Sequence, residues 1–225
     1  MIRVANSEEF KRLLEALAFD VGSANIHWRL YRDLLAALKA DTIVWQQSQT
    51  FWYLTLNAHT FAALQSLSRA FDQNQTSLHL LSWLRTIEDN LHLFEVDQFK
   101  DRLAGNPFVD SLAESSRSPS RDLLAHDIAL CSIEDPKVKA LMQHRGNVLA
   151  HRNARTTATG RSLSTEFAIS VDDLEALLDR AHEIVNRYSN LFAASTYSRK
   201  MIGNDDYSYI FKCVREAVER SRSGA

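Results

Sequence analysis

The chain has 225 residues, 45% hydrophobic and 24% charged, which is the balance of a soluble globular protein large enough to bury a core. Its six glycines and three prolines fall far below the roughly 12% of average usage, which disfavours all-β folds and glycine-looped nucleotide folds and favours long helices. Two cysteines exclude a disulfide framework and a four-cysteine zinc site, and the formal net charge of −2 does not by itself suggest a nucleic-acid binder.

The first third of the chain has the apolar spacing of long helices. Asn6 and Glu9 have capping-box spacing, and apolar residues then recur with helical period as far as Leu38. This stripe continues across Gly22, so one long helix with a kink and two helices in tandem both fit. A second long helix is predicted over about 44–71.

The middle of the chain is predicted to contain shorter elements. Thr76 is expected to cap a leucine-rich third helix that reaches about Leu93. Residues 105–120 hold two prolines and five serines, which indicates a loop with at most one turn of helix. A short helix is predicted over 121–130.

Two strong helix starts follow. Asp135 is a good N-cap before a proline at the first helical position, and this helix is expected to reach about Asn153. Ser170 and Asp173 have capping-box spacing before the next apolar stripe. A C-terminal helix is expected over about 204–222, and together these elements predict a single all-α domain over residues 1–225.

No targeting or membrane segment is evident. The first ten residues open a charged amphipathic pattern without the apolar core of a signal peptide. No window approaches the roughly 18 consecutive apolar residues that a membrane span requires. We therefore expect a cytoplasmic protein with no membrane partner.

The common signatures of cofactor and metal enzymes are missing. The chain contains no phosphate-binding GxxxxGK[ST] loop, no HExxH and no CxxC. His144 and His151 share one segment, but on a regular helix they lie two turns apart, roughly 10.5 Å, which is too far for one ion. Neither a metal nor a cofactor is expected.

One segment is strongly basic. Residues 137–161 contain six Lys or Arg and no Asp or Glu, whereas the rest of the chain carries 20 basic and 28 acidic residues. The near-neutral total therefore conceals a local asymmetry that is typical of a polyanion site on an otherwise acidic protein. The alternative is an ordinary solvated helix face.

The helical phase singles out Arg145 within this segment. With 100° per residue, Arg145 lies at the centre of the apolar stripe that includes Val138 and Leu141, so its guanidinium must be paired or must face a groove or an interface. His151 lies roughly 120° away on a regular helix. The two side chains converge only if the helix is distorted or a second copy contributes, and Gly146 could supply a close approach or the distortion.

Arg145 and His151, separated by five residues with Ala150 before the histidine, resemble the active-site motif of the HEPN superfamily. Members of this superfamily are all-α domains found in RNA-cutting toxins and phage-defence proteins. The resemblance implies a dimeric, HEPN-like bundle of long antiparallel helices with additional short helices. It covers roughly residues 7–195, which form the expected core of the domain.

The wider layout resembles the AbiU-type, abortive-infection branch of the superfamily. Arg69 to Asp72 end the second long helix, a leucine-rich helix follows, and Arg152 and Asn153 come directly after the motif. Two positions differ from the common pattern of the family. Gly146 stands where a polar residue usually follows the arginine, and Asn153 stands where aspartate is frequent.

The resemblance implies a metal-independent endoribonuclease whose composite site forms across a homodimer. His151 would move the proton of the RNA 2′-hydroxyl or of the leaving 5′-oxygen, and Arg145 would hold the scissile phosphate. RNA is then the substrate, and a cognate antitoxin is a possible partner. The expected RNA contacts are Lys139, Arg152 and Arg155, and the expected supporting residues are Asn147, Asn153, Arg69 and Asp72.

Two other interpretations stay open at this point. The first is a catalytically inactive HEPN-like dimer that binds RNA or a nucleotide, which Gly146 favours. The second is a structural or interaction protein in which Arg145 pairs with an internal acid such as Asp72. Separately, Arg69 and Asp72 have the i, i+3 spacing of an ion pair within one helix.

Overall fold

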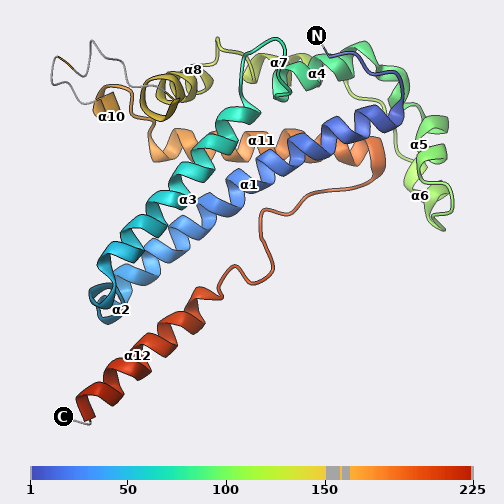
Figure 1. The fold of residues 1–225 in the computed structure, drawn as a ribbon. Coiled ribbons are helices and arrows are strands. Elements are labelled where there is room, and N and C mark those ends of the chain that lie inside the picture. The colour runs from blue at the N-terminus through green and yellow to red at the C-terminus, as the bar shows by residue number, and fades with distance from the viewer. Residues whose placement is uncertain (1, 151–157, 159–162, 224–225) are drawn as a thin grey trace.

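The structure is a computed structural model that describes residues 2–150, 158 and 163–223, without the side chains of 150, 163 and 164. Its regular structure is helical and, within the described residues, includes no strand, which confirms the all-α prediction. The described helices, labelled as in Figure 1, are α1 (Ser7–Ala40), α2 (Thr42–Gln47), α3 (Gln49–Ala70), α4 (Leu80–Asp89), η1 (Leu91–Phe94), α5 (Val96–Arg102), α6 (Val109–Ala113), α7 (Arg121–Leu130), α8 (Pro136–His144), η2 (Arg145–Ala150), α10 (Leu163–Glu166), α11 (Val171–Ala193) and α12 (Tyr207–Ser223).

Helix α1 is one continuous helix of 34 residues, so two helices in tandem do not form. Its start has the predicted capping box: the Asn6 side chain accepts a hydrogen bond from the Glu9 N–H at 2.9 Å, and the Glu9 carboxylate accepts one from the Ala5 N–H at 2.8 Å. Gly22 lies within the helix, where an added Cβ would meet no described atom within 4 Å. The glycine therefore does not end the helix, because the buried stripe continues on both sides of it.

The core lies where α1 packs against α3 and α11. Helix α3 runs antiparallel to α1, and α11 lies against both helices (Figure 1). Aromatic rings fill the end of the core near the start of α1, where the Phe10 ring lies 4.7 Å from that of Phe192 and 5.9 Å from that of Trp83. A second apolar cluster joins the far ends of α1 and α3 around Leu34 and Trp52.

The helix predicted over 44–71 is divided into α2 and α3, which corrects the prediction. The break at Ser48 turns the chain so that the Trp52 indole N–H donates to the Val44 carbonyl at 3.1 Å and both side chains become buried. A single straight helix would not bring these two groups together in this way. Tertiary packing of Trp52 therefore overrides the continuous helical pattern.

The start of the third helix is also corrected. The cap of α4 is His79, not Thr76. The His79 Nδ1 accepts from the Ser82 N–H at 3.3 Å, and the Ser82 hydroxyl accepts from the His79 N–H at 3.0 Å, which is a capping box built from an unusual pair. Thr76 instead donates its hydroxyl proton to Asn74 within the preceding turn.

The helix predicted to reach about Leu93 ends at Asp89 and is followed by the separate 3₁₀ helix η1, which corrects its end. Most of the other predicted bounds agree with the structure. Helix α7 has the predicted bounds, α8 and α11 begin where their caps predicted, and 105–120 contains the single short helix α6. Helix α12 docks on the far cluster, where Phe211 is buried and Arg215 pairs with Asp41 at 2.6 Å. None of the described helices is long and apolar enough to cross a membrane.

Two glycines give a direct test of this backbone. Gly22→Ala is expected to stabilise the protein by up to about 1 kcal/mol, because alanine is the better helix former and its methyl group has space. Gly203→Ala is expected to destabilise the protein, because Gly203 has φ +79° and a Cβ there would lie 2.6 Å from Asp206 Oδ2. Thermal denaturation should therefore show a higher Tm for the first variant and a lower Tm for the second, and a lower Tm for Gly22→Ala would contradict the continuous α1.

Candidate functional site

The basic segment begins at α8, whose first turn is fixed from two sides. Asp135 caps the helix by accepting hydrogen bonds from the N–H groups of Lys137 at 2.9 Å and Val138 at 3.1 Å. The same carboxylate pairs with Arg180 of α11 at 3.1 Å, and both side chains are largely buried. These hydrogen bonds and the Arg180 guanidinium outweigh the opposing effect of burial, so the pKa of Asp135 lies below its usual value.

The helix changes geometry at Arg145. Val138 and Leu141 of α8 are fully buried, and from Arg145 to Ala150 the chain continues as a wider π-helical turn. The Asn147 side chain hydrogen-bonds to the preceding turn: its Nδ2 donates to the Gln143 carbonyl at 2.9 Å. The segment is therefore helical through Ala150, but the angles of a regular α-helix do not apply to the motif.

Arg145 is paired. Its Nη1 donates to Asp72 Oδ1 at 3.0 Å, and the side chains are 32% and 17% exposed. Asp72 lies just past the end of α3, where the same oxygen accepts from the N–H groups of Gln73 at 2.8 Å and Asn74 at 3.3 Å. The carboxylate is thus held by the turn that follows α3, and Arg145 meets a preorganised partner. Of the outcomes that the sequence left open, which were a pair, a groove or an interface, the described residues show the pair, and Asp72 is the partner that the structural interpretation named.

Arg69 does not pair with Asp72, which corrects the predicted i, i+3 ion pair. Its guanidinium binds Asp20 of α1, with Nη2 at 2.5 Å and Nε at 3.0 Å from Oδ1. The physical reason is that α3 ends at Ala70, so Asp72 leaves the helical path on which i, i+3 neighbours meet. Arg69 therefore ties the end of α3 to α1.

The positive charge of the segment is partly compensated. Lys137 forms an ion pair with Asp173 in the first turn of α11, and this contact together with the Ser170 hydroxyl lowers the pKa of Asp173. Lys139 is exposed on α8. Of the predicted RNA-binding residues, Lys139 is thus the one that the described structure places at the surface.

Gly146 is exposed at the start of the π-helical turn. A Cβ built there would meet no described atom within 4 Å. Of the two expected roles of Gly146, the distortion of the helix is present at this position, whereas a close approach by a second copy stays a prediction. A larger side chain would fit at Gly146.

Four predicted site residues, His151, Arg152, Asn153 and Arg155, lie outside the described residues. The described half of the candidate site consists of Arg145 with Asp72 beside it, together with Asn147 and the exposed Lys139. The remaining histidine of the segment, His144, is used structurally: its Nδ1 donates to the Phe167 carbonyl at 2.8 Å and ties the end of α8 to the chain after α10.

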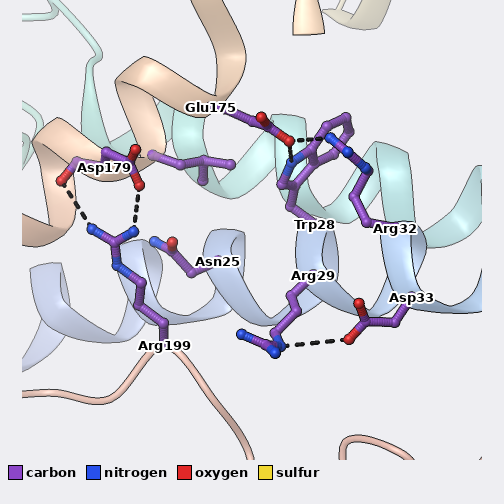
Figure 2. A pocket seen from close by; sticks show the side chains of 9 residues that line it. Asn25, Trp28, Arg29, Arg32, Asp33, Glu175, Asp179 and Arg199 are labelled. Atoms are coloured by element: carbon purple, nitrogen blue, oxygen red, sulfur yellow. Dashed lines mark hydrogen bonds and ion pairs between the residues drawn. The ribbon is translucent and has the colours of Figure 1, made fainter. Parts of the chain in front are cut away.

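A separate cavity of about 350 Å³ opens between α1, α11 and the connector that leads to α12 (Figure 2). Three arginines line it, and each faces one carboxylate, as Figure 2 shows. These pairs are Arg32 with Glu175, Arg199 with Asp179, and Arg29 with Asp33. Arg199 lies on the connector, so its pair with Asp179 ties the connector to α11 beside the cavity. Arg145 does not line it.

Sequence reasoning missed the carboxylates that hold this region together. Three ion pairs are involved: Asp20 with Arg69, Asp173 with Lys137, and Asp135 with Arg180. Asp135 and Asp173 could be recognised only as helix caps, and Asp20 has no local signal because its partner lies 49 residues away. Among the residues that the structure describes, no group of three metal-binding side chains forms.

Comparison with known protein families gives a match over most of the chain. A sequence model of the HEPN-type family described as AbiU2 matches residues 7–210. No curated protein and no solved structure matches the chain.

The cap of α8 generates a pH prediction. Because the pKa of Asp135 is lower in the folded than in the unfolded chain, its contribution to stability is fully present above the unfolded value near 3.9 and is lost as the pH falls through the lower folded value. Urea denaturation between pH 7 and pH 3 should show a shallower loss of stability for Asp135→Asn than for the wild type. Glu134→Gln, at the exposed neighbouring carboxylate, is the control and should follow the wild type; equal slopes for all three proteins would contradict the role of Asp135.

The Arg145–Asp72 pair predicts a measurable coupling. In a double-mutant cycle of Arg145→Gln and Asp72→Asn, the unfolding free energies should show a coupling of about 0.5–1 kcal/mol, the upper part of the range for partly exposed pairs. Asp72→Ala should cost more than Asp72→Asn, because alanine also removes the acceptor of two main-chain N–H groups. The exposed Lys100–Asp110 pair is the matched control and should show no measurable coupling; the same result at Arg145 would mean that the pair is incidental.

Proposed function

The chain belongs to the AbiU2 family of HEPN proteins, and from this premise we propose that it is a metal-independent endoribonuclease of the toxin or phage-defence type. The observation that carries the proposal is the state of Arg145. It stands at the first position of the family motif, at the start of a π-helical turn, and its side chain is partly exposed. Its pair with Asp72 is also the contact that the structural interpretation expects, so the pair itself does not favour cleavage. Such π-helical turns are frequent at functional sites.

The proposed reaction needs only the RNA and three side chains, which are two copies of His151 and one Arg145. His151 takes the proton of the 2′-hydroxyl, and the 2′-oxygen attacks the adjacent phosphorus while the bond from phosphorus to the 5′-oxygen breaks. The leaving 5′-oxygen receives a proton from the protonated imidazole of a second His151, so the products carry a 2′,3′-cyclic phosphate and a 5′-hydroxyl. Arg145 stabilises the additional negative charge on the phosphoryl oxygens in the transition state.

A second histidine is available if two copies of the chain place their motifs across a two-fold axis, and we propose this homodimer as the active form. A two-fold axis brings the same residue of each copy to opposite sides of one cleft. Lys139, Arg152 and Arg155 of the basic segment would then contact the flanking phosphates. DNA lacks the 2′-hydroxyl and should not be cleaved. A cognate antitoxin that covers this cleft is a further partner consistent with the proposal.

Gly146 favours a second candidate, an inactive HEPN-like dimer that binds RNA without cutting it. The polar residue that usually follows the arginine is missing, and packing does not explain its loss, because a Cβ at this position would meet no described atom within 4 Å. The same observation gives the experiment a useful variant, since Gly146→Asn restores a polar group without a clash.

The test is a cleavage assay on labelled single-stranded RNA in the presence of EDTA. The wild type should produce 2′,3′-cyclic phosphate ends, and His151→Ala and Arg145→Ala should each lower the rate by about 10²-fold or more, the usual contribution of a general acid–base or of a charge-stabilising group. Arg121→Ala, at an exposed arginine in the first turn of α7, is the control and should retain the activity.

Two outcomes overturn the endoribonuclease. Cleavage by His151→Ala at the wild-type rate would assign the activity to another site or to a contaminant. Intact RNA combined with an affinity that falls steeply with salt and drops in Arg145→Ala would support the inactive binder. In that case, cleavage gained by Gly146→Asn would identify the missing polar group as the cause.

A further inference from the structure

One face of α3 is exposed and apolar. Phe51, Leu54 and Phe61 are 57%, 60% and 51% exposed, and Ala58 between them is also exposed. With 100° per residue, these four side chains fall within an arc of about 80°, on the side of the helix opposite to the buried Leu56. The four residues are called the α3 stripe below.

The stripe is larger than a scatter of single apolar residues. An aromatic side chain buries about 150–250 Å² when it leaves water completely, so three large side chains that are each more than half exposed present roughly 300 Å². Single exposed apolar residues are normal on a protein surface, whereas contiguous patches of this size are often functional. The stripe is therefore a candidate docking surface.

The absence of charge on α3 favours a second copy of the same helix as the occupant. Residues 49–68 contain no Asp, Glu, Lys or Arg. A two-fold axis places a face against itself, so a charged face would meet its own like charges, whereas this one does not. The outer faces of α1 and α12 differ, since they carry ion pairs such as Lys11 with Glu15 and Lys212 with Glu216.

The spacing of the stripe selects one arrangement of the two copies. Its residues are three, four and three positions apart, which is the heptad spacing of helices that cross at about 20°. About a two-fold axis level with residue 56, Leu54 faces Ala58 of the partner subunit, and Phe51 faces Phe61 of the partner subunit. A large side chain thus meets a small one at the inner contacts, and two rings meet at the outer contacts. We propose that the α3 stripe binds the α3 stripe of a second copy of the chain in this antiparallel register.

This interface is distinct from the homodimer proposed at the motif. Helix α3 ends at Ala70, which lies about 21 Å beyond the axis at 1.5 Å per residue. The motif regions of the two copies would therefore lie about 40 Å apart and could not share one cleft. A chain that uses both interfaces forms a tetramer, and a chain that uses the α3 stripe alone forms a dimer.

The size of the contact predicts reversible assembly. Two stripes together remove roughly 600 Å² of apolar surface from water, and the uncharged neighbours Thr50, Asn57 and Gln65 extend the contact towards the roughly 1,200 Å² at which standard interfaces begin. Interfaces at this lower limit are typical of weak association. Sedimentation velocity of the full chain should therefore show a mass that increases with protein concentration in the micromolar range.

Two charge variants and their mixture test the register. Leu54→Lys and Ala58→Glu should each lower the mass of the assembly by about half, because each places a charge without a partner in the apolar contact. An equal mixture of the two variants should regain the larger mass, since the introduced ammonium group of one then faces the introduced carboxylate of the other. This recovery would also show that both variants are folded.

Tyr53→Lys is the matched control. Tyr53 is 61% exposed on the same helix, but it lies about 120° from the centre of the stripe, so this variant should assemble like the wild type. RNA cleavage by Leu54→Lys should equal that of the wild type, because the stripe is remote from the motif. The assembly and the proposed RNA chemistry can thus fail independently.

Three results would overturn the proposal. The first is a wild type that stays monomeric at all concentrations, or stripe variants with the mass of the wild type. The second is a loss of mass in both single variants without recovery in the mixture, which would exclude the antiparallel register. The third is a monomer that binds phosphatidylcholine vesicles through the stripe, shown by loss of binding in Leu54→Lys, which would assign the surface to a membrane.

Discussion

The region around the motif depends on one constraint: a guanidinium on the buried face of a helix must meet a carboxylate. Arg145 is partly exposed, so its pair with Asp72 contributes about 0.5–1 kcal/mol rather than the larger amount of a fully buried pair. Asp72 satisfies this constraint, and Asp72 is itself held by the main chain that follows α3. The end of α3 is in turn tied to α1 by Arg69 and Asp20. Two ion pairs thus link the first helix to the end of α3 and the end of α3 to the motif.

Helix α11 also contacts basic side chains at both of its ends. Arg102 and Arg117 donate to the carbonyls of Phe192 and Asn190 in its last turn, where the helix dipole is negative, and each guanidinium also lies over an aromatic ring. Burial lowers the pKa of Arg102 to about 10, so it remains charged at neutral pH. At the other end of α11, Asp173 receives Lys137. Both ends of α11 are therefore held by these contacts, and α8 packs against this helix.

The sequence predicted those features that are set by neighbouring residues. The caps at Asn6, Asp135 and Ser170 form because each side chain reaches an N–H group two or three residues ahead, and this spacing is visible in the chain. The need of Arg145 for a partner was also predictable, because helical phase shows which face is buried. The break at Ser48 was not, since it follows from where Trp52 packs.

The partner of Arg69 and the π-helical turn at Arg145 were unpredictable for a related reason. Asp20 is 49 residues from Arg69, and nothing in the spacing distinguishes it from other carboxylates. A π-helical turn adds a residue to a helix without any fixed sequence signature, so phases computed at 100° per residue lose their meaning beyond it. Arg145 could therefore be placed from the sequence, whereas its angle to the next motif residue could not.

The ion pair leaves the choice between cleavage and binding open. A guanidinium carries five N–H donors, and its bond to Asp72 uses Nη1, so a carboxylate on one edge is compatible with a phosphate on another. Pairing with Asp72 therefore orients Arg145 for either proposed role and does not distinguish them. The difference must lie in the groups that handle protons. Contacts with the described residues do not require glycine at Gly146, so a polar side chain at this position is the change that tests the two proposed roles.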